Sequence, residues 1–362
     1  MPSRRSPSLK PIPSHRVPSS KSYLSNRFRY IGLSIACICL YLWHHSSFHL
    51  LSLRPPPHAP SLIYKNVDWT RFAYALYATN SAYLCNALMV FSSLAQLGSK
   101  ADRVLFYPQE WNLEVESSTD RDSQLLVKAR DIFGVELVPV EAAIGMKYGA
   151  WGLTQYDRVI WLKSDVTVLK HMDGLFLAPR ASAALVRAYW ELPEERELAS
   201  SFVLLEPSEV DFQQLAAAAR SMAEQEEARD MNLLNRFYKD SAMVLSHREY
   251  GMMTEELRVD DHTNFLGNIV EPWDPHKVIK EASLVHFSDN PLPKPWIMWP
   301  HKLIGDIMPR CKLGDLGNDD CRNKKIWTEL YDDFRKRRKD VCALLSAPAP
   351  DWPPRNATSE EE

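Results

Sequence analysis

The stretch at residues 159–169 reads VIWLKSDVTVL, and the fold predicted for the chain starts from it. Its first four residues are apolar, as in a buried strand, and they are followed by Lys163, Ser164 and Asp165 before a second apolar run begins. A carboxylate at the end of a buried strand suits a divalent cation that holds phosphate. A single aspartate at such a position also often caps a loop or a helix, so Asp165 alone leaves both interpretations open.

Short apolar strands alternate with helical stretches on both sides of this segment, which is the pattern of a mostly parallel α/β sheet. The predicted strands are 73–79, 103–107, 136–140 and 158–162, then 183–189, 202–205 and a short strand ending at 285–287. The predicted helices are 83–97, 123–133, a helix-rich part at 209–235 and a terminal helix at 324–345. The sequence therefore predicts one large α/β domain, with a Rossmann-like sheet flanked by helices and ligands at the carboxyl ends of its strands.

The N-terminal part of the chain predicts a membrane anchor. Residues 1–29 contain seven basic residues and no acidic one, and residues 30–53 contain no Lys, Arg, Asp or Glu. The uncharged stretch is long enough to span a bilayer, and the basic tail before it places the N-terminus in the cytosol. A cleaved signal peptide is the alternative, although no small-x-small cleavage site follows the apolar run. The proline-rich residues 54–71 are then a stem for a lumenal domain at 72–346 of a single-pass type II protein.

The cysteines fit an oxidising compartment beyond such an anchor. Cys37 and Cys39 lie in the predicted span. Four cysteines remain, and they allow three complete pairings: Cys85, Cys311, Cys321 and Cys342. Cys311 and Cys321 are close together in a Gly- and Asp-rich segment and are the favoured pair. The acidic, proline-containing residues 347–362 predict a disordered tail.

Two further segments carry candidate site residues. His286 ends a short strand, and a proline-rich loop with Lys294 follows it. An imidazole can ligate a metal and an ammonium can neutralise a departing diphosphate, but a satisfied histidine in a surface loop fits the spacing equally well. Residues 77–83, YATNSAY, place aromatic, hydroxyl and amide groups at the end of the first strand. Those groups can hold a nucleotide base or cap the next helix.

These pieces occur together and in order, and as a set they resemble one enzyme family. The set comprises Thr79 and Asn80 with Tyr83, Lys147, the run LTQYDR at 153–158 that leads to Asp165, the run DMNLLN at 230–235, and His286 with the KPW at 294–296. In this combination the chain resembles the glycogenin-like family 8 glycosyltransferases, and within them the fungal-type Golgi α-N-acetylglucosaminyltransferases. The resemblance covers about residues 72–300.

The resemblance implies a GT-A fold, a UDP-sugar donor, Mn²⁺, and retaining transfer of N-acetylglucosamine to a glycan or glycoprotein acceptor in the Golgi lumen. It implies that Thr79, Asn80 and Tyr83 hold the uridine, and that Asp165 and His286 ligate the metal. The other implied donor-site residues are Lys147, Lys163, Ser164 and Lys294, with Asp230 and Lys294 as the catalytic residues. No nucleic-acid partner is expected, because the charge run at 324–345 fits a solvated helix face.

Lys163 departs from the family pattern, which is Asp-x-Asp at this point. An ammonium in place of a carboxylate reverses the local charge where a cation should bind. Three interpretations follow: the metal affinity is damaged, the ammonium itself meets the diphosphate, or Lys163 turns away and leaves Asp165, His286 and the diphosphate to hold the ion. The sequence thus predicts an active Golgi glycosyltransferase, with a catalytically silent Golgi protein that binds nucleotide sugar or glycan as the alternative.

Overall fold

The computed structural model describes residues 66–111, 113, 120–141, 147–223, 230–289, 294–313, 319–343 and 347–348 of the chain. The chain from Asp68 onward forms one compact unit. The predicted basic tail, the predicted span at 30–53 and residues 54–65 of the predicted stem lie outside the described residues, as does the tail after residue 348. Within the described part of the chain, none of the helices is both long and apolar enough to cross a bilayer.

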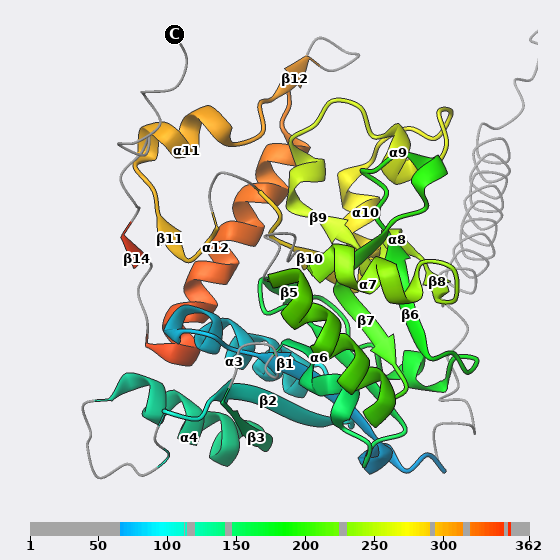
Figure 1. Cartoon of the computed structure of the whole chain (residues 1–362). Helices are drawn as coiled ribbons and strands as arrows, with labels where there is room; N and C mark the ends of the chain where they lie inside the picture. Colours follow the sequence, from blue (N-terminus) through cyan, green and yellow to red (C-terminus); the bar gives the residue numbers. More distant parts are fainter. Residues whose placement is uncertain are drawn as a thin grey trace, which may run out of the picture. The chain divides into compact units, whose positions relative to one another are not determined.

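A seven-stranded sheet, in the order β3-β2-β1-β4-β7-β6-β8, forms the centre of the unit (Figure 1). Its strands are β1 (Phe72–Tyr77), β2 (Asp102–Pro108), β3 (Val135–Val140), β4 (Arg158–Leu162), β6 (Ala183–Arg187), β7 (Leu198–Leu205) and β8 (Met243–Leu245). The first four are parallel to one another, and β8 is parallel to β6. Only β7 runs antiparallel to the strands on both of its sides. The prediction of an α/β domain with a mostly parallel sheet is confirmed.

Both faces of this sheet are buried, as a parallel sheet requires. On one face, Ala73 and Ala75 of β1 share a core with Leu215 of α6 (Glu209–Ala223) and Leu234 of α7 (Asp230–Tyr238). The alternate residues of β1 are equally buried, so helices also cover the opposite face. There α3 (Ser81–Gln96) contacts β1 and packs against both α4 (Arg121–Phe133) and α12 (Arg322–Cys342).

A second, three-stranded sheet brings two distant segments of the chain together. It consists of β5 (Val166–Val168), β10 (Leu284–His286) and β9 (Met252–Met253). Because β10 is antiparallel to β5, His286 lies opposite Val166 and therefore beside Asp165. Two smaller pairings also occur, between β11 (Ile297–Met298) and β14 (Ala347–Pro348) and between β12 (Lys312–Leu313) and β13 (Asp319–Asp320).

Short helices connect these strands. They are η1 (Trp69–Arg71), η2 (Gly149–Gly152), η3 (Asp173–Leu177), η4 (Pro193–Glu195), α8 (His247–Tyr250), η5 (Thr254–Leu257), α9 (Thr263–Leu266), α10 (Pro275–Glu281) and α11 (His301–Ile307). Two disulfides cross-link the unit. The predicted Cys311–Cys321 bond is confirmed, and the second bond joins Cys85 of α3 to Cys342 of α12.

Candidate functional site

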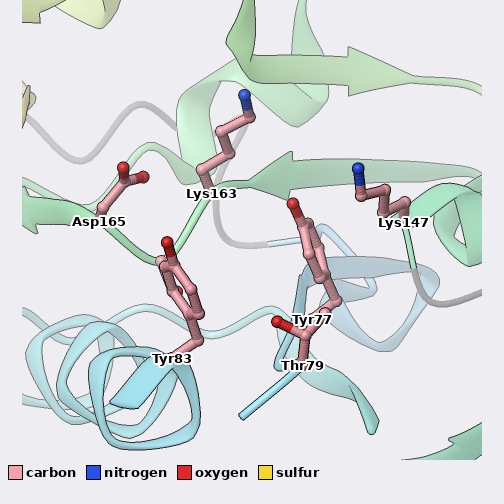
Figure 2. Close-up of a pocket in the computed structure, with 7 residues that line it drawn as sticks. Tyr77, Thr79, Tyr83, Lys147, Lys163 and Asp165 are labelled. Carbon is pink, nitrogen blue, oxygen red and sulfur yellow. The ribbon is translucent and has the colours of Figure 1, made fainter. Parts of the chain in front are cut away.

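A cavity of about 290 Å³ opens at the carboxyl ends of β1 and β4 (Figure 2). Tyr77 is the last residue of β1, and Lys163 directly follows β4. The cavity is lined by Tyr77, Thr79, Tyr83, Lys147, Lys163, Ser164 and Asp165. This is the edge of an open α/β sheet where ligands bind, since the loops that follow adjacent parallel strands converge there.

The loop between β1 and α3 is held by a helix cap. The Asn80 side-chain oxygen accepts hydrogen bonds from the backbone N–H groups of Ala82 and Tyr83, at 3.0 and 3.1 Å. Asn80 therefore starts α3, and the cap places Tyr83 in the first turn, facing the cavity. Burial, and then the negative charge of Asp165, raise the pKa of Tyr83, so its phenol is a neutral hydrogen-bond donor at pH 7.

Asp165 forms the centre of a first charged cluster. Its Oδ2 lies 3.1 Å from His286 Nε2 and 3.2 Å from Lys294 Nζ. The backbone brings these groups together, because β10 pairs with β5 and the Phe287 N–H donates to the Asp165 carbonyl at 2.9 Å. Lys294 also donates to the carbonyl of Phe287. Two segments more than a hundred residues apart thus meet at one carboxylate.

The partners of Asp165 keep it ionised. Burial alone would raise the pKa of this carboxyl group. The electrostatic effect of His286, followed by those of Lys294 and Lys163, outweighs burial and lowers the pKa of Asp165 well below its usual range. A permanently negative carboxylate therefore lies at the cavity wall at neutral pH.

Asp230, the first residue of α7, forms the centre of a second cluster. Its Oδ1 accepts from Lys147 Nζ at 3.2 Å and from the Tyr148 hydroxyl at 3.0 Å. Its Oδ2 lies 3.6 Å from Lys163 Nζ, which also donates to Ser200 Oγ at 3.2 Å. In Figure 2 the Lys163 side chain extends away from Asp165. Lys163 is thus paired with the second carboxylate of the site and does not occupy the space beside the first.

The structure brings nearly all of the sequence-predicted site residues to this cavity. Six of them line it: Thr79, Tyr83, Lys147, Lys163, Ser164 and Asp165. His286 and Lys294 join it through Asp165, and Asp230 joins it through Lys147 and Lys163. Asn80 directly follows Thr79, and its side-chain oxygen is engaged in the helix cap. The functional roles assigned to these residues stay predictions.

Three further polar residues belong to the site. Tyr77 lines the cavity, Tyr148 donates to Asp230, and Ser200 of β7 accepts from Lys163. Tyr77 belongs to the predicted stretch 77–83, and Tyr148 directly follows the predicted Lys147, so both could have been proposed from the sequence. Nothing in the sequence pattern around Ser200 signals its contact with Lys163, because β7 reaches the site only through its pairing with β4.

Asp165 and His286 are the side chains of this site best placed to share a metal ion. Across the described ranges, no cluster of three or more His, Cys, Asp or Glu side chains could hold a metal by itself. His286 Nε2 is a buried nitrogen that makes no aligned hydrogen bond, although it lies 3.1 Å from Asp165 Oδ2. Two ligands about 2.1 Å from an octahedral ion and at right angles are about 3.0 Å apart, so this separation fits a shared ion.

The chain is similar in sequence to several fungal proteins. No family model matches it. Over 316 residues it is 48% identical to glucose N-acetyltransferase 1 of Aspergillus fumigatus, an alignment that covers 80% of this chain and 82% of that protein. The chain belongs to the glucose N-acetyltransferase 1 family. A second member of this family, from Gibberella zeae, is 42% identical over 302 residues, covering 79% of this chain and 66% of that protein.

Membership of the glucose N-acetyltransferase 1 family confirms the resemblance to fungal-type enzymes and the prediction that the chain is a glycosyltransferase. Among solved structures, the chain is similar to the glycosyltransferase GlyE of Streptococcus pneumoniae TIGR4, with 18% identity and a TM-score of 0.46. That overlap covers 72% of this chain and 60% of GlyE. The assignment to the family is based on the fungal relatives alone.

Proposed function

We propose that the chain is a retaining, GT-A-type glycosyltransferase that transfers N-acetylglucosamine from UDP-N-acetylglucosamine to a glycan acceptor. The observation that carries the proposal is the meeting of Asp165, His286 and Lys294 at the edge of a polar cavity. Family membership supports the reaction class, and the names of the relatives support the N-acetylated sugar.

The distribution of charge in the cavity suits a sugar diphosphate. Lys147 and Lys163 line it, and Lys294 contacts the lining residue Asp165; each ammonium group has donors beyond the contacts made within the described residues. Thr79 and Tyr83 line the end nearest α3, where a uridine can contact a hydroxyl and a neutral phenol. Asp230 then lies at the opposite side of the cavity, between two lysines, where the donor sugar is expected.

Mn²⁺ is the proposed cofactor, and Asp165 and His286 are its proposed ligands. The distance of 3.1 Å between Asp165 Oδ2 and His286 Nε2 fits this role, and so does the lack of an aligned hydrogen bond at this nitrogen among the described residues. With two protein ligands, the coordination shell has room for diphosphate oxygens and water. A bound divalent cation would supply charge neutralisation for the leaving diphosphate.

The residues of the chain provide position and charge for the reaction. Lys294, fixed by Asp165 and the Phe287 carbonyl, directs a remaining N–H at the departing diphosphate and stabilises its developing charge. Asp230 is held by Lys147, Tyr148 and Lys163 and accepts hydrogen bonds from sugar hydroxyl groups. Because the leaving group is stabilised in this way, the acceptor hydroxyl needs little assistance from a strong base.

The proposed location is the Golgi membrane, with residues 1–29 in the cytosol, 30–53 in the bilayer, 54–71 as the stem and the catalytic unit in the lumen. Two disulfides in the catalytic unit support an oxidising compartment, since such bonds are rare in the cytosol. Proteinase protection of intact microsomes tests this arrangement: the catalytic unit should become sensitive only after detergent is added.

The proposed reaction is tested by UDP release from UDP-N-acetylglucosamine with Mn²⁺, using the full-length protein in detergent. The wild-type protein should release UDP, and His286→Ala should lose the activity by about 1,000-fold, because the metal site would keep a single ligand. His276→Ala, which alters an exposed histidine of α10, is the matched control and should retain activity. Full activity of His286→Ala would remove the proposed site.

A catalytically silent nucleotide-sugar-binding protein is the second candidate, and Lys163 favours it. The pairing of Lys163 with Asp230 occupies a carboxylate that could otherwise contact the sugar. Lys163→Asp separates the two candidates. A silent wild-type protein should gain UDP release on this change, whereas an active wild-type protein should lose activity, because the introduced carboxylate would repel Asp230. Lys302→Asp on α11, an exposed lysine, controls for the altered charge.

A further inference from the structure

Asp289 is a buried carboxylate three residues beyond His286, and its side chain is 0% exposed. Its Oδ1 accepts from Arg258 Nη1 at 2.8 Å. Its Oδ2 accepts from the Thr254 and Tyr331 hydroxyls, each at 2.6 Å, and from Trp327 Nε1 at 3.3 Å. A carboxylate offers about four lone-pair positions, so these four donors, three of them on Oδ2, match its acceptor capacity.

The four donors come from different parts of the fold. Thr254 and Arg258 lie at the two ends of η5, and Trp327 and Tyr331 lie one turn apart on α12. A buried charge is tolerated only when it is paired and fully hydrogen-bonded, and Arg258 supplies the opposite charge. Asp289 therefore fixes the segment after β10 against η5 and α12 in one geometry.

The helix α12 also packs against Phe287, next to His286, and against Trp296, near Lys294. Phe287 packs edge-on against Tyr331 and Phe334 of α12, with centroid distances of 5.2 and 4.9 Å. Trp296 lies 5.8 Å from Phe334, and Lys294 Nζ lies 5.9 Å from the centre of the Trp296 ring. His286 precedes Phe287, so α12 lies behind both of the side chains that contact Asp165.

The proposed chemistry does not use Asp289 directly, because its side chain has no exposed surface and its acceptor positions are filled. We infer that Asp289 is a positioning residue: it anchors residues 286–289 to η5 and α12, and so sets the positions of His286 and of the Phe287 carbonyl that holds Lys294 beside Asp165. The inference concerns the site whose activity is proposed above, but the anchoring can be tested without turnover.

Asp289→Asn is the decisive variant. An amide replaces one acceptor oxygen with a donor, so its NH₂ group faces either the Arg258 cation or the three donors that bond to Oδ2. Hydrogen exchange measured by mass spectrometry should show at least about 10-fold faster exchange in peptides covering 284–289, where the Phe287 N–H bonds to Asp165. Peptides from β1 should exchange as in the wild type.

Two further variants keep this test informative. Asp240→Asn makes the same chemical change at an exposed carboxylate and should leave exchange at 284–289 unchanged. Tyr331→Phe removes one of the four donors while keeping the carboxylate, and should give a smaller increase in the same peptides; it replaces Asp289→Asn if that variant does not fold. Unchanged exchange at 284–289, or an equal increase throughout the unit, overturns the anchoring role.

The kinetic prediction is a fall of about 10–100-fold in kcat for UDP release, with a raised Mn²⁺ requirement, in folded Asp289→Asn. A loss confined to the yield of folded protein, with wild-type kcat and Mn²⁺ dependence, overturns the inference. If the wild-type protein releases no UDP, the proposed function fails. The exchange experiment still decides whether Asp289 anchors the segment.

Discussion

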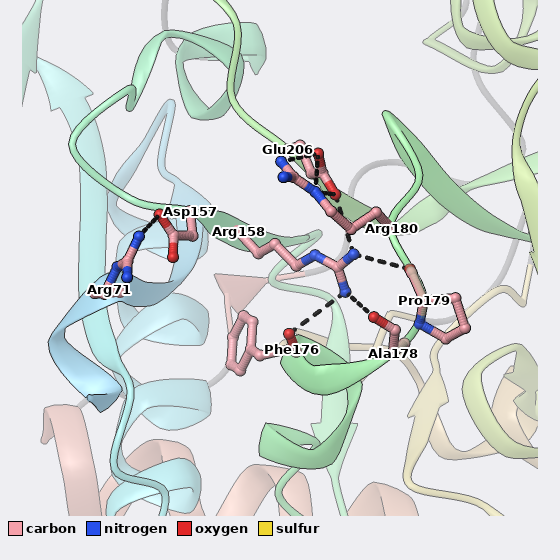
Figure 3. Close-up of polar contacts among 8 residues, drawn as sticks. All are labelled: Arg71, Asp157, Arg158, Phe176, Ala178, Pro179, Arg180 and Glu206. Carbon is pink, nitrogen blue, oxygen red and sulfur yellow. Dashed lines mark hydrogen bonds and ion pairs between the residues drawn. The ribbon is translucent and has the colours of Figure 1, made fainter. Parts of the chain in front are cut away.

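The two ends of the central sheet carry cavities of the same size, about 290 Å³ each, and both are lined with charge. One lies at the carboxyl ends of β1 and β4 and is the proposed donor site. The other lies at the amino ends of these strands, where Arg71 precedes β1 and Arg158 begins β4 (Figure 3). The two cavities differ in how many N–H donors of their charged side chains are hydrogen-bonded to other residues of the chain.

At the amino end, both terminal nitrogens of the buried cation Arg158 have two acceptors each. Arg158, which is 5% exposed, donates to the carbonyls of Phe176, Ala178 and Pro179 and to Glu206 (Figure 3). Glu206 accepts from both Arg158 and Arg180. This cluster links the start of β4, the end of β7 and the loop after η3, so its role is to stabilise the fold.

At the carboxyl end, the ammonium groups retain unused donors. Lys147 has one acceptor among the described residues, and Lys294 has two, while an ammonium has three N–H groups. The comparison shows that a charged cavity of a given size does not by itself indicate a ligand site. Donors that the fold leaves unsatisfied, aimed into the cavity, are the more informative observation.

The largest expected effect tests the carboxyl end. Lys294→Ala should lower kcat for UDP release by about 100–1,000-fold, because one donor to the leaving diphosphate is lost. Steady-state kinetics with UDP-N-acetylglucosamine measure it, and Lys302→Ala on α11 is the exposed control. Wild-type kcat in Lys294→Ala would mean that the carboxyl-end cations are structural, like those at the other end of the sheet.

The next effect tests the amino end. Arg158→Met removes the donor to three carbonyls and leaves Glu206 partly unpaired, so the free energy of unfolding should fall by about 3–5 kcal/mol. Urea denaturation measures this loss, with Arg236→Met on α7 as an exposed control. UDP affinity of the folded variant, measured by calorimetry, should stay at the wild-type value. A weakened affinity would show that the two ends are coupled.

A smaller effect depends on pH. The hydrogen bond from Arg180, which outweighs burial, lowers the pKa of Glu206 from its usual 4.5. Its stabilising contribution is therefore present above about pH 4.5 and is lost as the pH falls through the lower folded-state value. Glu206→Gln should be less stable than the wild type by about 1 kcal/mol at pH 7, with a smaller difference at pH 3. Denaturation at both pH values checks this, and an unchanged difference contradicts it.

The smallest effect concerns a solvent-exposed pair at the same end. Arg71 and Asp157 lie 2.6 Å apart, but their side chains are 60% and 44% exposed. Arg71→Ala should change the free energy of unfolding by less than about 1 kcal/mol, since water screens such pairs. A loss as large as that of Arg158→Met would show that the whole amino-end cluster acts as one unit.

Hydrophobic patterning predicts the central elements well and the small ones poorly. The strand at Arg158–Leu162 has its predicted bounds, because four consecutive apolar residues mark it in the sequence. β7 starts at Leu198, four residues before the prediction, because Ser200 and Ser201 interrupt the apolar pattern there. The short strand predicted to end at 285–287 is β10, whereas β9 has two residues, too few for a period to be recognised, and its pairing with β10 alone establishes it.

The residues of the candidate site that belong to sequence motifs could be predicted. The contacts that depend on tertiary packing could not. The resemblance named Asp165, His286 and Lys294, and the structure brings them together. The direction of Lys163 depends on Asp230 and Ser200, which reach it from α7 and β7, so the three interpretations of this lysine could not be separated from the sequence. Asp289 likewise has donors 31 to 42 residues away in the chain, and only the folded structure reveals them.

The Cys85–Cys342 bond links residues 257 positions apart and turns the polypeptide between them into a closed ring. A protease that cuts one loop of this ring opens it without releasing a fragment, so the nicked protein keeps its mass until a reductant is added. In the chain-entropy account, such a ring also limits the unfolded ensemble by about 5 kcal/mol. Comparing reduced and non-reduced gels after limited digestion would therefore reveal how much of the chain the ring encloses.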